Sequence, residues 1–239
     1  MTTPYMPAVY GYGTGMSDIL YVLTLVLFGV SLICSAVVKS RFNTYSRERT
    51  ASGMTGAMAA ERILRANGIY DVTIVQTAGV LTDNYNPVNK TLNLSQAVYG
   101  GANVSAVAVA AHECGHAIQH AESYPLLMLR KSIAPVCNIG SSGSYICILL
   151  GLLFSIPPLI TVGALLFSAI VFFNLVTLPV EVDASRRALR QVEQMNLLTA
   201  DELTGGRRVL IAAGMTYFIS LVTSIVQLLR LLSLANRRR

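Results

Sequence analysis

Charged residues are scarce in this 239-residue sequence, at 13% of the chain, and tryptophan is absent. An average soluble domain carries about 25% charged residues. Hydrophobic residues make up 53%, and the mean hydropathy is +0.55. This balance argues against an ordinary soluble protein and predicts a membrane protein. The net charge of +6 comes from basic residues beside the apolar runs, as the positive-inside rule explains, so we expect no nucleic-acid partner.

The four cysteines lack the close spacing of a structural zinc knuckle, and we expect them to act as small hydrophobic residues rather than as a disulfide framework. Basic residues are also missing before Lys39, and no A-x-A site ends the first apolar run. That run is therefore not a cleavable signal peptide, and we expect it to remain as a membrane helix.

Four apolar runs predict a mainly α, multi-pass fold with about four transmembrane helices, since about 20 residues cross a hydrocarbon core. The predicted order begins with an N-terminal segment at 1–17, a transmembrane helix at 18–38 and a polar insert at 39–132. A hairpin of two transmembrane helices follows at 133–180, with apolar runs at 133–154 and 159–178. A polar helix at 181–208 then leads to the last segment at 209–239, which consists of a transmembrane run (209–229) and a basic tail.

The distribution of Lys and Arg predicts the orientation of these helices. None precede the first run, nine lie between Lys39 and Lys131, and five lie between Arg186 and Arg208. Both polar connections should therefore be cytoplasmic and the N-terminus outside. Four crossings then place the C-terminal arginines outside too, against the same rule. An interfacial or re-entrant fourth run is thus an alternative.

The polar insert predicts a small α+β unit. Residues 55–68 have the pattern of one helix, with Thr55 as N-cap and Gly68 as the stop. Alternating apolar residues at 72–74 and 92–94 flank a turn-rich stretch and predict a hairpin. Residues 105–121 predict a further helix.

All three histidines lie within this last helix, in the motif His112-Glu113-Cys114-Gly115-His116 followed by His120. Histidines four residues apart share one helix face and can bind one Zn²⁺, and Glu113 can reach a water molecule on that ion. A polar helix face with uncoordinated imidazoles is the alternative, but it does not explain why every histidine is clustered here.

A catalytic zinc needs a third protein ligand. His120 lies two turns from His112, about 12 Å along an unbroken helix, so we expect it beside the site or in an ordinary polar contact. A carboxylate from a distant helix is the other source, and Glu181 directly follows the third apolar run. From the residues alone, Glu181 could instead be an ordinary interfacial charge or the N-terminal charge of a helix beginning near Pro179.

Four separated motifs occur along the chain: 42–45 (FNTY), 81–87 (LTDNYNP), 112–120 (HECGHAIQH) and 178–189 (LPVEVDASRRAL). Together they resemble the YugP-like family of neutral zinc metallopeptidases of bacterial membranes, over about residues 39–232. The last motif also resembles the glutamate motif of HtpX-type membrane metalloproteases, except that Ser185 stands at the aspartate position. The resemblance implies a gluzincin-like site of His112, His116 and Glu181, with Asp183 beside it.

The activity implied is hydrolysis of a peptide or protein substrate at the cytoplasmic surface of the bacterial cell membrane, in contact with membrane lipid. Zinc would lower the pKa of its water to about 7, and Glu113 would pass the proton to the leaving amine. We expect residues 90–96 to be an edge strand for the substrate. The oxyanion-stabilising residue stays open among Tyr85, Tyr99, Tyr124 and Arg186.

Two other interpretations remain. A membrane scaffold or binding protein could carry a structural or degenerate zinc site, with His120 or Asp183 as the fourth ligand. An intramembrane protease would hold zinc within the bilayer, but the apolar stretch at 104–111 is too short to span it. We therefore expect the site at the membrane surface.

Overall fold

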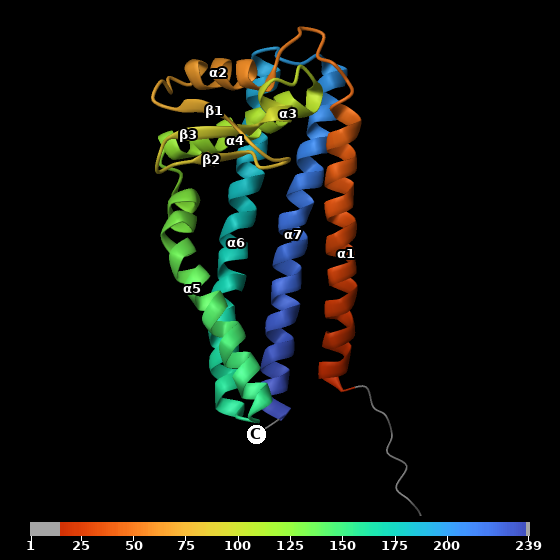
Figure 1. Ribbon diagram of the computed structural model, residues 1–239, viewed down its shortest axis with the longest axis vertical. Helices are drawn as coiled ribbons and strands as arrows, with labels where there is room; N and C mark the ends of the chain where they lie inside the picture. Colours follow the sequence, from red (N-terminus) through yellow and green to blue (C-terminus); the bar gives the residue numbers. More distant parts are fainter. Residues whose placement is uncertain (1–14, 238–239) are drawn as a thin grey trace, which may run out of the picture.

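The structure is a computed structural model that describes residues 15–237, so most of the predicted N-terminal segment lies outside the described residues. Four long helices form an elongated bundle: α1 (Met16–Tyr45), α5 (Pro125–Leu153), α6 (Pro157–Gln194) and α7 (Ala200–Arg237) (Figure 1). Smaller elements gather at one end of this bundle: α2 (Gly56–Ala66), β1 (Thr73–Thr77), β2 (Asn84–Asn86), β3 (Thr91–Ser95), α3 (Gln96–Tyr99) and α4 (Val104–Ala121). With 75% of the described residues helical and a small three-stranded sheet, the mainly α prediction is confirmed.

The four long helices correspond to the four predicted apolar runs. Among the described residues, each of them is long and apolar enough to cross a membrane. Large apolar side chains such as Phe28 and Leu165 are exposed on their outer surfaces, as expected for helices in contact with lipid. Helix α7 is continuous alongside α6 and α1, so the structure has no re-entrant break in the described part of the fourth run.

Helix α6 continues through Pro179, so the separate helix expected from residue 181 does not form. An interior proline removes one backbone hydrogen bond and crowds the preceding turn. Here Val176, Val180 and Ala184 are all buried on the face that carries Glu181, and this packing holds the helix together. Glu181 therefore lies on the same continuous helix as the third apolar run.

The sheet has the strand order β1-β3-β2, which differs from the predicted hairpin. Ile74 of β1 lies opposite Leu92 of β3 in a parallel pair, whereas β2 and β3 are antiparallel. The hairpin therefore joins β2 to β3, through a turn in which the Asn86 side chain accepts hydrogen bonds from the next backbone N–H groups. Strand β3 lies between β1 and β2, and its side chains Leu92 and Leu94 are fully buried. The prediction of an edge strand at 90–96 is therefore wrong.

Helix α4 is the centre of the smaller unit and joins it to the bundle. The core cluster runs from α2 and β3 through α4 to the ends of α6 and α7. The Asn103 side chain caps α4 by accepting a hydrogen bond from the N–H of Ala106, and Thr55 caps α2 in the same way. The two helices predicted in the insert are thus confirmed, at 56–66 and 104–121.

Two contacts between α1 and α7 mark the ends of an apolar stretch. At one end the Arg208 guanidinium donates to the Tyr45 hydroxyl, over 3.0 Å. At the other end Arg230 lies over the ring of Tyr21, 4.8 Å from its centroid. Arg208 and Arg230 are 22 positions apart. That corresponds to about 33 Å of helix, close to the hydrocarbon thickness of a bilayer. Arginine and tyrosine at both ends fit interfacial anchoring, which accounts for a positive charge at the far end of α7.

This antiparallel pairing predicts that the start of α1 and the end of α7 lie on one side of the membrane. In a variant without native cysteines, single cysteines at Gly15 and Asn236 should react with a membrane-impermeant thiol reagent in intact cells. A cysteine at Asn86 should react only after permeabilisation, because the charge count predicts that the polar connections are cytoplasmic. Different labelling of Gly15 and Asn236 would contradict the pairing across a membrane, and labelling of Asn86 in intact cells would contradict the orientation.

Candidate metal centre

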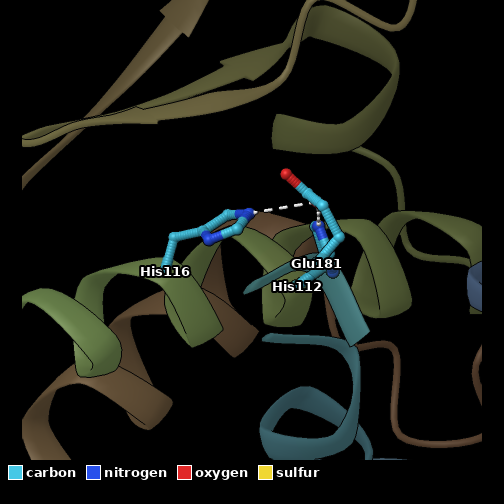
Figure 2. A group of neighbouring side chains, drawn as sticks. All are labelled: His112, His116 and Glu181. Atoms are coloured by element: carbon cyan, nitrogen blue, oxygen red, sulfur yellow. Dashed lines mark hydrogen bonds and ion pairs between the residues drawn. The ribbon is translucent and has the colours of Figure 1, made fainter. Parts of the chain in front are cut away.

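Two helices that are distant in the chain bring three potential metal ligands together. His112 and His116 project from α4 toward Glu181 of α6, and the ligand atoms of all three lie within 4.8 Å of one another (Figure 2). The same carboxylate oxygen, Oε2 of Glu181, lies 3.2 Å from Nε2 of His112 and 3.4 Å from Nε2 of His116.

These separations fit a tetrahedral zinc ion. With Zn–N and Zn–O bonds of about 2.0–2.1 Å, neighbouring ligand atoms of a tetrahedron are about 3.3 Å apart. The electrostatics also favour a cation. Burial alone would lower the pKa of His116, but the carboxylates of Glu181 and Glu113 raise it above its ordinary value. The residues present therefore fit zinc in both spacing and charge.

Each imidazole is held through its second nitrogen. The Nδ1 of His112 lies 3.1 Å from the Ser185 hydroxyl, and the Nδ1 of His116 lies 3.0 Å from Oε1 of Gln119. The Gln119 carbonyl oxygen can only accept, so it favours the His116 tautomer that leaves Nε2 free to bind a metal, and the Ser185 hydroxyl can accept from His112 in the same way. Ser185, which departs from the HtpX-type motif, thus contacts a proposed ligand directly.

Asp183 is one contact further from the site. Gln119 is fully buried, and its amide donates to Oδ2 of Asp183 at 2.8 Å and to the backbone carbonyl of Val180 at 2.9 Å. Arg187 holds the same Asp183 oxygen at 2.6 Å. Asp183 therefore positions Gln119, which in turn positions His116.

The second oxygen of Glu181 is bound by a residue that the sequence did not single out. Nη1 of Arg130, on α5, donates to Oε1 of Glu181 at 2.7 Å, and Glu181 is only 3% exposed. With Oε1 taken, Oε2 alone faces the histidines. In the sequence Arg130 looks like an ordinary basic residue before an apolar run. Only the three-dimensional structure shows that its side chain contacts Glu181.

Glu113 lies between the histidine pair and the sheet. Its Oε2 accepts a hydrogen bond of 2.9 Å from the backbone N–H of Tyr85 in β2. Burial raises the pKa of the Glu113 carboxyl, while the nearby charges of His112 and His116 oppose this rise. His120 does not face the three-residue group: its Nδ1 is 2.8 Å from the Tyr85 hydroxyl.

A cavity of about 370 Å³ adjoins these side chains. It is lined by β2 and its flanks, by α4, and by α5, α6 and α7: Asp83, Asn84, Tyr85, Pro87, His112, Glu113, His116, His120, Leu127, Met128, Arg130, Lys131, Ala134, Phe173, Glu181 and Tyr217. Of the four oxyanion candidates only Tyr85 lines it. Tyr217 was missed because a tyrosine within an apolar run gives no sign of a site.

Comparison with known proteins shows the family of this chain. A family described as "Putative neutral zinc metallopeptidase" matches residues 20–236. A protein of Bacillus subtilis (strain 168), "Putative membrane protease YugP", is 44% identical over 208 residues, which cover 87% of this chain and 92% of that protein. The chain belongs to this family, "Putative neutral zinc metallopeptidase". No solved structure matches it.

In this member of the metallopeptidase family, the glycine of the histidine motif sets the distance between α4 and α6. A Cβ at Gly115 would lie 2.5 Å from the backbone carbonyl oxygen of Ala184, far inside van der Waals contact. Ala184 is itself fully buried. No side chain larger than hydrogen fits at residue 115 unless one of the helices moves, and Glu181 would move with α6.

We therefore expect Gly115→Ala to destabilise the protein by about 1–3 kcal/mol, the usual effect of overpacking, and to weaken zinc binding as the helices separate. Thermal unfolding and a zinc titration on the purified protein measure both effects. Gly214→Ala is the matched control, because a Cβ there meets nothing within 4 Å. Equal stability and zinc affinity for Gly115→Ala and wild type would contradict the close approach of the helices.

Proposed function

We propose that this protein is a membrane-bound zinc metallopeptidase that hydrolyses peptide bonds at the cytoplasmic surface of the bacterial cell membrane. His112, His116 and Glu181 hold the zinc, and Glu113 is the general base. The observation that carries the proposal is the meeting of these four side chains, from α4 and α6, at one cavity.

The surroundings favour a catalytic site over a structural one. A structural zinc usually has four protein ligands, whereas a catalytic zinc has three and keeps one position for water or substrate. Within residues 15–237, His120 and Asp183 are the predicted candidates for a fourth ligand. His120 bonds to Tyr85, and Asp183 bonds to Gln119 and Arg187. This arrangement supports an open fourth position and gives no support to a scaffold with a closed zinc site.

Zinc held by these ligands supplies a water molecule with a pKa near 7 and polarises the scissile carbonyl. Glu113 removes the proton of the attacking water as its oxygen bonds to the carbonyl carbon. The same carboxyl then delivers that proton to the amine nitrogen as the C–N bond breaks, which yields a carboxylic acid and an amine, and the acid's proton then passes to the amine.

The substrate backbone is best placed along β2. An extended peptide can add to a free sheet edge, and β2 is an edge strand whose residues Asn84 and Tyr85 line the cavity. The hydrogen bond from Tyr85 to Glu113 places this edge beside the general base. It replaces residues 90–96, which lie in the centre of the sheet, as the expected substrate strand.

The proposal predicts different effects for the base and the ligands. Glu113→Gln should keep one zinc per chain and lose at least about 100-fold in hydrolysis, because general acid–base catalysis typically supplies that much. His112→Ala and Glu181→Ala should lose tightly bound zinc and activity together. Metal analysis and an assay on an unfolded protein substrate measure both quantities.

Glu61→Gln is the control, since Glu61 is an exposed carboxylate of α2 that pairs with Arg65. It should match wild type in zinc content and in rate. Wild-type hydrolysis by Glu113→Gln, or full zinc content in Glu181→Ala, would show that the roles are assigned wrongly.

A further inference from the structure

The cavity at the candidate metal centre lies across the boundary between the polar and apolar parts of the chain. Arg130 and Lys131 line it just before the apolar run of α5, and Glu181 lines it just after the apolar run of α6. Ala134 and Phe173, which line it as well, belong to those two runs. The reacting groups are thus level with the ends of the apolar helices.

The position of Tyr217 in α7 independently indicates the same depth for the cavity. Tyr217 lines the cavity, yet it lies nine positions beyond Arg208 in the direction of Arg230. That is about 14 Å into the apolar stretch that the two arginines bracket. The floor of the cavity therefore lies below the interfacial contact between Arg208 and Tyr45.

The two walls of the cavity differ in chemistry. The wall from β2 and its flank is polar, with Asp83 and Asn84 beside the backbone of an edge strand. The bundle contributes an apolar wall of Leu127, Met128, Ala134 and Phe173, beside the polar side chains that α5, α6 and α7 also place in the lining. A wholly polar peptide would leave the second wall in contact with water, whereas a segment with adjacent polar and apolar parts would cover both walls.

The two helices that line the cavity on either side of α6 are not packed against each other. Helices α5 and α7 flank α6 (Figure 1), and each packs along it. In the part of the chain that the structure describes, α5 and α7 make almost no contact with each other, although both line the cavity. The two helices that line the apolar side of the cavity are thus not packed against each other, and a neighbouring membrane helix would approach between them.

We infer, building on the proposed function, that the substrates are membrane proteins cleaved in the segment that directly flanks a transmembrane helix. The polar residues of such a segment extend along β2 and present the scissile bond to Glu113. Its first apolar residues lie against Phe173 and Met128, and the helix itself stays in the lipid beside α5 and α7.

A set of anchored substrates tests this inference with the full-length protein in lipid vesicles that contain zinc. All substrates carry the same transmembrane helix and the same cleavable segment, separated by flexible spacers of about 2, 10 or 30 residues. Because every substrate is anchored, confinement to the membrane is equal throughout. Cleavage with the shortest spacer should be at least about 10-fold faster than with the longest, the effect of seating one apolar side chain.

Phe173→Ser should bring the rates for short and long spacers close together, because it removes the largest apolar side chain of the wall. Phe172→Ser is the matched control: this neighbour on α6 is 48% exposed, lies outside the cavity lining and should keep the wild-type ratio. A variant that has lost its fold is recognised by its loss of bound zinc. In that case the inference is tested by the wild-type spacer series alone.

Equal rates at all spacer lengths in wild type, or faster cleavage with long spacers, would overturn the inference. If that cleavage still depended on Glu113, the proposed function would nevertheless stand. If no substrate is cleaved in a Glu113-dependent manner, the proposed function itself fails, and the inference fails with it.

Discussion

Helices α4 and α6 meet at two points on the same face, and the arrangement of the site depends on this contact. At Gly115 the α4 backbone lies against the carbonyl of Ala184, and one turn later the buried Gln119 amide bonds to the carbonyl of Val180. Glu181 lies between these two contact points along α6. Its carboxylate is therefore fixed opposite His112 and His116 by helix packing, without a flexible loop.

The same packing gathers charge in a place with little solvent. Glu181 and Glu113 are both buried, and an uncompensated buried charge costs several kcal/mol. Arg130 balances one carboxylate, and the imidazoles offer neutral nitrogen ligands rather than further negative charge. A divalent cation among these groups would supply the missing positive charge. In the family to which the chain belongs, zinc is the natural candidate.

Local patterns in the sequence predicted the helices, whereas the strand order and the full set of site residues depend on contacts between distant segments. The spacing of His112 and His116 and the four apolar runs reflect helix geometry within single segments, so they could be read directly. Glu181 was assigned through the family resemblance. The strand order could not be predicted from the sequence, because the alternation of apolar residues around Leu92 does not say which strands lie on its two sides. Arg130 and Tyr217 were missed because, in sequence, one looks like a membrane-boundary charge and the other like part of an apolar run.

The zinc site itself is tested most directly by X-ray absorption spectroscopy on the zinc-loaded full-length protein. The structure predicts two imidazole ligands and oxygen ligands, all at about 2.0–2.2 Å, with one oxygen from solvent that exchanges with an added small anion. A sulfur ligand at about 2.3 Å would implicate Cys114 and contradict this account. A third imidazole, which only His120 could supply, would show that α4 breaks after His116 and that Glu181 is not the ligand.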